Sequence, residues 1–317
     1  MPQWSTTALI FPGQGSQEVG MGADLVEAFP EARTTYAQAD DILGFALSSL
    51  SFNGPESELT QTINTQPALY VMGIAIARVL HAAFGSAMQP GFLAGHSLGE
   101  FTALTAAGAL PFEDGLRLVR ERGRLMAQAG QRSPGAMAAV LGLEAEAVRQ
   151  LCADVSIQLG ATLVLANDNC PGQAVISGAA PAIEAALQLA ADRGAKRVVP
   201  LAVSVASHSP LMDSITSEFR QALEDTPFAT PSVPIIGNVS AAPLTSVEDI
   251  RDELGAQLTS TVRWTESVIA LRAQGVETFV ELGPKDVLTG LVKRIDRAAT
   301  RVNLNDAASI QAFLMSH

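Results

Sequence analysis

The chain alternates short, continuously apolar runs with longer stretches in which apolar residues recur at helical spacing. The runs Ala8–Phe11, Phe92–Ala94 and Thr278–Leu282 have the length and composition of buried strands. Between them, Pro67–Phe84 is apolar all round and predicts a buried helix, whereas Phe112–Gln128 has one apolar face and predicts an amphipathic helix. Strands that alternate with helices are typical of an α/β domain with a mainly parallel sheet.

A separate unit is indicated between residues 134 and 203. Its apolar segments follow the order strand, helix, strand, strand, helix, strand, which is the ferredoxin-like pattern of a small α+β subdomain. Gly194 follows the second helix and suits the position just past a helix end. We therefore expect residues 1–133 and 204–317 to form one large domain that the subdomain interrupts. The predicted elements of the subdomain are the strand Ala136–Leu143, the helix Glu144–Val155, the strands Thr162–Asn167 and Gln173–Ser177, the helix Ala179–Arg193 and the strand Arg197–Val203.

Composition narrows the class of protein. Of the 317 residues, 48% are hydrophobic and 16% are charged, which provides a core and argues against long disordered tails. A net charge of −12 disfavours binding to nucleic acid. We expect no signal peptide, because the first residues lack a basic segment, and no membrane span, because no uncharged apolar run is long enough. The cysteines, Cys152 and Cys170, lack metal or redox spacing, so we expect both to be reduced in a cytoplasmic protein.

Residues 95–100 read Gly-His-Ser-Leu-Gly-Glu and stand between a predicted strand and a stretch rich in helix formers. That is the context in which a G-x-S-x-G motif forms a nucleophile elbow. Small residues two positions before and after Ser97 allow a sharp turn, and the following helix offers free N–H groups and its positive dipole end to an oxyanion. The motif predicts that Ser97 is a nucleophile; a tight turn that merely needs glycines is the alternative.

A nucleophilic serine needs a base, and His208 is the favoured candidate among the four histidines. It follows the apolar run 201–206, at the predicted end of a strand, where catalytic residues often lie. His96 adjoins Ser97, but adjacent side chains at a tight turn point apart. A structural, hydrogen-bonded role for His208 is the alternative.

A Ser-His-Asp hydrolase places its acid between the serine and the histidine in chain order. The candidates Asp154, Asp168 and Asp192 all fall in the predicted subdomain, and none follows a strand of the main sheet. We therefore expect no catalytic acid, and a backbone carbonyl or an amide that orients His208 instead. This weakens a generic lipase or esterase interpretation.

The helix after the elbow carries a row of arginines, which usually marks a solvated face. Arg120 and Arg124 share one face at a spacing of four residues, whereas Arg122 points toward the apolar side. An arginine on that side needs a partner, and a substrate carboxylate would supply one through a bidentate pair.

Taken together, these motifs resemble the malonyl-CoA:acyl carrier protein transacylases and the acyltransferase domains of polyketide synthases. The resemblance covers nearly the whole chain and implies an α/β-hydrolase-like large domain with a ferredoxin-like insert. The motifs that carry it are Phe-Pro-Gly-Gln-Gly-Ser-Gln at 11–17, Thr-Gln-Pro-Ala-Leu at 65–69, the elbow at 95–100, Arg122-Gly123, Ala-Asn-Asp-Asn at 166–169 before Pro-Gly-Gln at 171–173, Ser207-His208, Asn238-Val239 and Glu-Leu-Gly-Pro at 281–284.

The resemblance implies a role for each matching residue. Ser97 would form the acyl-serine, His208 would act as its base, and Arg122 would hold the malonyl carboxylate. The further implied roles are an oxyanion hole from the backbone N–H groups of Gln14 and Leu98, a glutamine near the histidine at Gln257, and a backbone carbonyl that orients the imidazole at Asn238. Asn64 and Lys285 depart from the family, which often has glutamine and glycine there.

The implied reaction passes an acyl group from a CoA thioester, through serine, to the phosphopantetheine thiol of a carrier protein, with no bound cofactor and no metal. Ser207 is small, which leaves room for an α-methyl group, whereas Leu98 is typical of malonyl-selective members; we expect malonyl, with methylmalonyl as the alternative. A hydrolase of acyl thioesters and a non-catalytic carrier-binding module are further alternatives. The family is often monomeric.

An acidic carrier protein would need a local basic patch on this acidic chain. The residues at 285, 293, 294, 297 and 301 form the densest late basic cluster, and a merely solvated helix face is the alternative.

Overall fold

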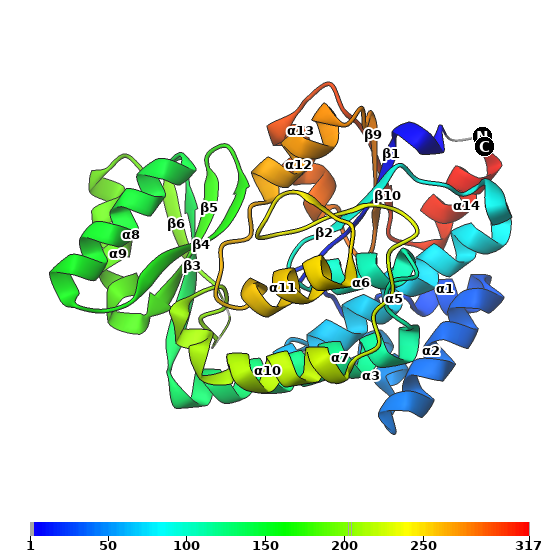
Figure 1. Cartoon of the computed structure of the whole chain (residues 1–317), viewed down its shortest axis with the longest axis horizontal. Helices are drawn as coiled ribbons and strands as arrows, with labels where there is room; N and C mark the ends of the chain where they lie inside the picture. Colours follow the sequence, from blue (N-terminus) through cyan, green and yellow to red (C-terminus); the bar gives the residue numbers. More distant parts are fainter. Residues whose placement is uncertain (1–2, 202, 204, 317) are drawn as a thin grey trace.

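The computed structural model describes residues 3–201, 203 and 205–316. It contains a six-stranded sheet and a four-stranded sheet, each with its own helices (Figure 1). In the six-stranded sheet the neighbours pair in parallel except β8, which runs antiparallel to β7. The strands of this sheet in spatial order are β10 (Thr300–Leu304), β9 (Thr278–Leu282), β1 (Thr7–Phe11), β2 (Phe92–Gly95), β7 (Ile235–Ile236) and β8 (Pro243–Leu244).

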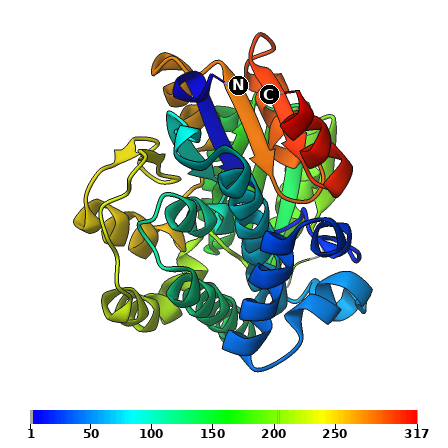
Figure 2. The ribbon, with the colours of Figure 1, turned by 90° about the vertical axis from the view of Figure 1, so that its right-hand side faces the viewer.

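The central strand β1 is buried on both faces, as its continuous apolar run predicts. Leu9 and Phe11 pack into one hydrophobic cluster, and Ala8 and Ile10, which point the other way, pack into a second. Figure 2 shows β1 in blue beside the orange strands of the C-terminal part, in agreement with the β1–β9 register. Helices therefore cover both faces of this sheet, and the carboxyl end of β1 lies beside that of β2.

The helices of the large unit include a set that the hydrophobic pattern does not reveal, α2 to α4. The helix α5 begins earlier than predicted, because Pro67 lies inside it rather than at its start. The bounds are α1 (Ala23–Ala28), α2 (Pro30–Leu43), α3 (Leu47–Asn53), α4 (Glu56–Leu59), α5 (Thr62–Phe84), α6 (Leu98–Ala106), α7 (Phe112–Arg132), α10 (Asp213–Asp225), α11 (Val247–Gln257), α12 (Trp264–Ala273), α13 (Val287–Ile295) and α14 (Ala307–Met315), with 3-10 turns at Trp4–Thr6, Gly85–Ala87 and Pro210–Met212.

The helix α5 corrects the reason given for expecting no membrane span, since Thr62–Ala87 is long and apolar enough to cross a membrane by length and composition, with a mean hydropathy of 1.6. Of its most apolar window, however, 67% is buried inside the protein. A buried core helix satisfies the same criteria, and α5 is such a helix.

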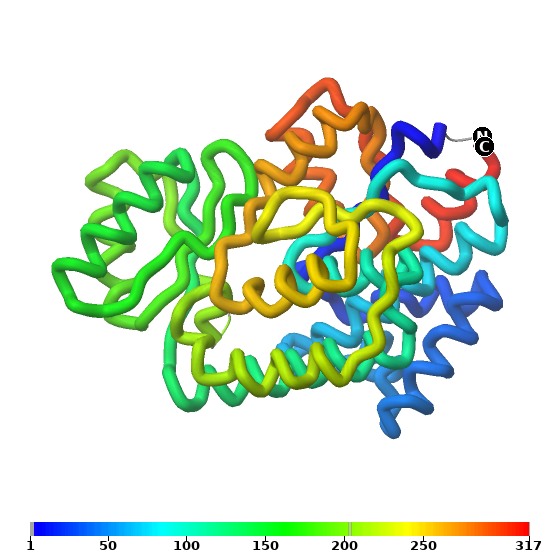
Figure 3. Tube along the Cα trace, in the orientation of Figure 1, coloured from blue at the N-terminus to red at the C-terminus, as the bar shows by residue number. Residues whose placement is uncertain are grey.

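The second sheet forms the lobe at the left of Figures 1 and 3, between α7 and α10 in the chain. All its pairings are antiparallel, and the predicted order of strands and helices is confirmed. The strand β4 extends through most of the predicted loop at 168–172. The predicted last strand, to Val203, runs through Ala202, and that residue and the predicted domain boundary at 204 lie outside the described residues. The bounds are β3 (Gly135–Leu141), α8 (Ala145–Leu159), β4 (Leu163–Cys170), β5 (Gln173–Ala179), α9 (Ala180–Asp192) and β6 (Arg197–Pro200), with the strands in the order β4-β5-β3-β6.

Candidate active site

The predicted strand–turn–helix around Ser97 is present. The strand β2 ends at Gly95, α6 begins at Leu98, and Ser97 between them has a φ of +52°, a left-handed value that non-glycine residues rarely adopt. A Cβ on Gly95 would lie 1.9 Å from the carbonyl carbon of Gly99, and one on Gly99 would lie 2.0 Å from the carbonyl oxygen of Phe11. Both motif glycines are therefore required for the turn to pack against the end of β1.

His208 is the hydrogen-bond partner of Ser97 in the structure, as a base would be. Its Nε2 lies 2.9 Å from Ser97 Oγ, and its Nδ1 lies 2.8 Å from the backbone carbonyl oxygen of Gln257. Because a carbonyl only accepts, Nδ1 carries the proton and Nε2 accepts from the serine hydroxyl. Burial, together with the positive charge of Arg122, lowers the pKa of His208 to about 3, so the imidazole is neutral at neutral pH.

Three other expectations about the base can now be judged. His96 does not contact the nucleophile, since its Nε2 lies 2.8 Å from Asn169 Oδ1. None of the three aspartates considered bonds to His208; for example, Asp168 Oδ1 accepts from Thr265 Oγ1 at 2.6 Å. The expectation that Asn238 supplies the orienting carbonyl is wrong, because its backbone oxygen accepts from Arg263 N, at 2.8 Å, and the carbonyl of Gln257 takes its place.

Asn238 instead holds the elbow itself. Its Oδ1 accepts from the backbone N–H of Ser97 at 2.7 Å, and its Nδ2 donates to the carbonyl of Gly95 at 2.7 Å. One buried amide thus bonds to both sides of the turn and stabilises the left-handed conformation of the serine.

Arg122 points to the apolar side, as expected, and is only 1% exposed. Its Nη1 donates to Gln66 Oε1 at 2.9 Å, and its Nη2 donates to Gln257 Oε1 at 2.8 Å and to Ser97 Oγ at 3.2 Å. Within the described residues, Arg122 forms no ion pair, and its Nε has no hydrogen-bond partner. Burial lowers its pKa to about 10, which leaves the guanidinium charged at neutral pH. The site therefore holds a buried cation beside Ser97 whose three hydrogen-bond acceptors are neutral oxygens, while the carboxyl of Glu100 is near enough to act on its pKa.

Two residues that line the cavity beside Ser97, Gln14 and Leu98, are expected to donate their backbone N–H groups to an oxyanion. Within the part of the chain that the structure describes, neither donates a hydrogen bond, and Leu98 is the first residue of α6. Gln14 is held by its side chain, whose Oε1 accepts from Thr62 Oγ1 at 2.8 Å. N–H groups at a helix start are suited to developing negative charge.

A cavity of about 280 Å³ opens onto Ser97 between the two sheets. Ser207 lines it, as expected, whereas Gln257 and Asn238 are buried behind the reacting groups and do not line it. The large unit contributes among others Gln14, Ser97, Leu98, Arg122, His208 and Leu291, and the small lobe contributes Met137, Ala139, Asn167, Asn169, Gln173 and Val175.

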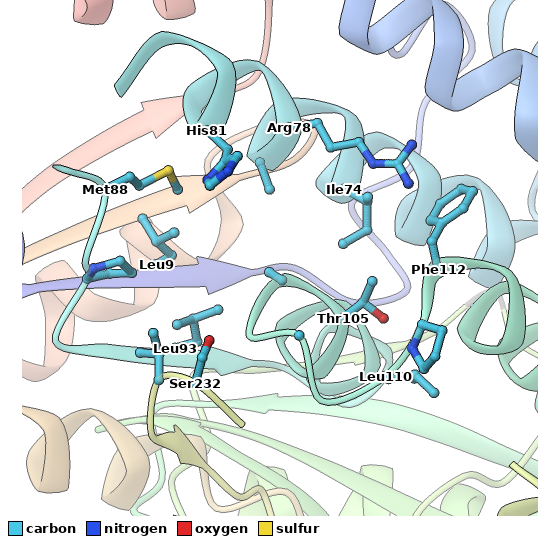
Figure 4. Close-up of a pocket in the computed structure, with 16 residues that line it drawn as sticks. Leu9, Ile74, Arg78, His81, Met88, Leu93, Thr105, Leu110, Phe112 and Ser232 are labelled. Carbon is cyan, nitrogen blue, oxygen red and sulfur yellow. The ribbon is translucent and has the colours of Figure 1, made fainter. Parts of the chain in front are cut away.

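A larger cavity, of about 530 Å³, lies away from this site (Figure 4). Three of its polar side chains already bond to the protein: Thr105 Oγ1 with Tyr70, Ser232 Oγ with the carbonyl of Ala107, and Arg78 Nη1 with Thr35 and Gln38. Ser232 and His81 both line this cavity, but Ser232 Oγ donates to a backbone carbonyl and not to the imidazole. Among the described residues, no group of three His, Cys, Asp or Glu side chains is placed to hold a metal ion.

Two buried polar residues at the site were missed by sequence reasoning, Gln66 and Glu100. Each is a polar residue within an apolar helix, which is the signal that could have revealed them. The two departures from the family are explained in part: Asn64 Oδ1 accepts from Arg120 Nη1 at 3.1 Å, and Lys285 has a φ of +62°, which favours glycine.

The elbow serine shares its hydroxyl with a histidine and a buried arginine, and that histidine has no carboxylate partner among the described residues. Set in an α/β fold, this arrangement is the one that a serine-dependent acyltransferase needs. Residues 8–310 match the family model of the acyl transferase domain. The chain is 46% identical over 307 residues to the malonyl CoA-acyl carrier protein transacylase of Bacillus subtilis, which covers 97% of this chain and 96% of that protein. The chain belongs to the malonyl-CoA:acyl carrier protein transacylase family.

Solved structures agree with this assignment. An acyl carrier protein S-malonyltransferase from Vibrio cholerae superposes with a TM-score of 0.92 at 46% identity, over 98% of this chain and 100% of that one. A malonyl-transacylase solved in complex with a type II polyketide synthase acyl carrier protein superposes with a TM-score of 0.94 at 43% identity, over 98% of this chain and 99% of that one.

Proposed function

We propose that this protein transfers the malonyl group from malonyl-CoA to the phosphopantetheine thiol of an acyl carrier protein through an acyl-Ser97 intermediate, for fatty-acid or polyketide synthesis. The observation that carries the proposal is the shared hydroxyl: Ser97 Oγ lies 2.9 Å from His208 Nε2 and 3.2 Å from Arg122 Nη2. One contact supplies a base, and the other places a cation where the free carboxylate of a malonyl thioester would lie.

In the first half-reaction, His208 Nε2 takes the proton of Ser97 as Oγ attacks the thioester carbonyl. The N–H groups of Gln14 and Leu98 stabilise the tetrahedral oxyanion, and one such donor contributes about 10²–10³ in rate. Collapse breaks the carbon–sulfur bond, and the CoA thiolate takes the proton from His208. In the second half-reaction, His208 takes the proton of the carrier thiol, whose sulfur attacks the acyl-serine, and Ser97 leaves with that proton.

Arg122 decides which acyl group reacts. A guanidinium has five N–H donors, and three of the hydrogen bonds described above use its two Nη atoms, so donors remain for a carboxylate. A charge-assisted hydrogen bond of this kind contributes about 1.5–3 kcal/mol. Ser207 is the small cavity residue that would admit an α-methyl group, so methylmalonyl-CoA is the alternative donor.

A similar malonyl-transacylase was solved in complex with an acyl carrier protein, which supports a carrier protein as the acceptor here. Within the predicted basic cluster, Lys285 Nζ donates to the carbonyl of Gln17 at 3.0 Å and Arg294 bonds to the β4–β5 turn, so these two serve the fold. Lys293 and Arg297 are exposed, on and just after α13, the helix that lines the cavity through Leu291. We propose these two as the carrier contact, since charge there would sit beside the cavity.

We also propose a more specific architecture for the two units. The strand order of the lobe and its helices α8 and α9 support a ferredoxin-like subdomain over 134–203, and the elbow on a mainly parallel sheet supports an α/β-hydrolase-like domain over 1–133 and 204–317. We further propose a cytoplasmic monomer that needs no bound cofactor or metal.

Intact-protein mass spectrometry tests the function. The protein is mixed separately with malonyl-CoA, methylmalonyl-CoA and acetyl-CoA, and holo carrier protein is then added. A malonyl adduct on Ser97 that moves to the carrier supports the transacylase. An adduct that decays to free acid despite the carrier indicates a hydrolase, and no adduct from any donor refutes acyl transfer from these thioesters.

A further inference from the structure

Glu100 is a buried carboxyl group that the proposed reaction does not use. It lies in the first turn of α6, three residues after Ser97, and is 0% exposed. Its Oε2 accepts a hydrogen bond from Gln257 Nε2 at 2.5 Å, while its Oε1 has no partner among the described residues. A buried, half-satisfied carboxyl is costly to the fold, which calls for a compensating role.

Gln257 connects this carboxyl to every reacting group. Its Oε1 accepts from Arg122 Nη2 at 2.8 Å, its Nε2 donates to the carbonyl of Ser97 at 3.1 Å, and its own backbone carbonyl accepts from His208 Nδ1 at 2.8 Å. A glutamine amide can be turned over, which exchanges its donor and its acceptor. Only the orientation with Nε2 toward Glu100 and the carbonyl of Ser97 presents an acceptor to Arg122.

The charges around Glu100 bear on what it does. Burial, and then the carboxylate of Glu253, raise the pKa of Glu100 well above its ordinary value, whereas Gln257, the backbone N–H of Asn238 and the Arg122 cation lower it in part. Burial, the largest of these causes, favours the protonated, uncharged form of the carboxyl. In that form Glu100 bonds to Gln257 without adding a negative charge beside Arg122.

On the basis of the proposed function, we propose that Glu100 is a positioning residue for malonyl selectivity. Its carboxyl holds the amide of Gln257 with Oε1 toward Arg122, and this fixes the guanidinium in the cavity for the carboxylate of the donor. Acetyl-CoA has no such carboxylate, so its reaction depends much less on where the guanidinium lies.

The test compares Glu100→Met, which removes the acceptor at similar volume, with Glu100→Gln, which keeps an acceptor oxygen and is permanently neutral. The measured quantity is kcat/KM for acylation by malonyl-CoA and by acetyl-CoA, in the full-length protein. In Glu100→Met we expect the malonyl-to-acetyl ratio of kcat/KM to fall about tenfold, which corresponds to the loss of one hydrogen bond. In Glu100→Gln we expect this ratio to stay near that of the unmodified protein. In a Gln257→Met background, Glu100→Met should cause no further fall.

A folded Glu100→Met protein with an unchanged ratio overturns the inference, because a merely structural role lowers both rates alike. So does a fall in Glu100→Gln as large as in Glu100→Met. If Glu100→Met does not fold, Glu100→Asp takes its place, since a side chain one methylene shorter cannot hold Gln257 in the same way and the same fall is expected. An unmodified protein that malonyl-CoA fails to acylate refutes the proposed function itself, which separates the two failures.

Discussion

Replacing Arg122 by alanine is expected to convert the donor preference from malonyl to acetyl. The guanidinium is 1% exposed, donates hydrogen bonds only to neutral oxygens and forms no ion pair among the described residues, so a malonyl carboxylate would supply one. Losing that charge-assisted hydrogen bond, at about 1.5–3 kcal/mol, corresponds to a fall of roughly 10- to 150-fold in kcat/KM for malonyl-CoA. Acetyl-CoA loses no such bond, so its rate relative to malonyl-CoA should rise by the same factor.

The same substitution should also change the pH dependence. The Arg122 cation is one cause of the low pKa of His208, so removing it raises that pKa. Since the base works in its neutral form, the acid limb of the acetyl-CoA reaction should move to higher pH.

The assay is the rate of Ser97 acylation, followed by intact mass over a pH series with each CoA thioester in turn. The matched control is Arg124→Ala on the same helix, because Arg124 is exposed and pairs with Glu121 on the surface. Arg122→Met repeats the test with less loss of volume. An unchanged malonyl-to-acetyl ratio in both Arg122 variants, with the fold intact, would refute the assignment of the guanidinium to the substrate carboxylate.

Three further predictions concern the base, the elbow and the carrier surface. For the free enzyme, kcat/KM for acylation should be level from about pH 5 to 8 and fall only as the pH approaches the low pKa of His208, near 3; an acid limb near the ordinary value of about 6.5 would contradict the assigned environment. Gly99→Ala should lower the thermal midpoint of unfolding strongly or prevent folding, because the added Cβ would lie 2.0 Å from a carbonyl oxygen. The control Gly290→Ala, whose Cβ would have nothing within 4 Å, should be neutral or stabilise the protein by about 0.5–1 kcal/mol. Equal midpoints for the two variants would argue against the close packing of the elbow. Charge reversal at Lys293 and Arg297 should raise the KM for carrier protein and leave that for malonyl-CoA unchanged, and an unchanged carrier KM would place the docking surface elsewhere.

The order of helices and strands could be predicted where the hydrophobic residues follow one clear spacing along the chain. The strands β1 and β2 and the whole lobe follow from continuous apolar runs and from turn residues such as Gly194, whose φ is +87°. The start of α5 could not be predicted, because Pro67 suggests a first helical turn. In the structure, the carbonyl of Ile63, four residues earlier and left without its helical donor, accepts from Arg120 Nη1 at 3.2 Å. A contact from a distant helix thus compensates for the proline, and no local pattern encodes it.

The candidate site, like the fold, could be predicted only in part. Ser97, His208 and Arg122 are visible in the sequence because their side-chain chemistry is distinctive and their neighbours mark a turn, a strand end or an apolar helix face. The acceptor for His208 Nδ1 is not visible, because it is a backbone carbonyl 49 residues away and every residue has one. The role of Gln257 in joining the three groups emerges only when α11 is placed behind the elbow.

The lack of a carboxylate partner for His208 among the described residues fits what the buried arginine requires. Ser97 Oγ lies within 3.2 Å of both His208 and Arg122, and the Arg122 cation lowers the pKa of His208. An ionised acid bonded to the imidazole would interact with the same cation and weaken its attraction for the carboxylate of a malonyl group. A neutral carbonyl from Gln257 orients the imidazole without adding charge, and burial, which raises the pKa of Glu100, disfavours a negative charge there as well. The arrangement gives up the help an anion would lend to the imidazolium and keeps Arg122 unpaired for a substrate that brings its own negative charge.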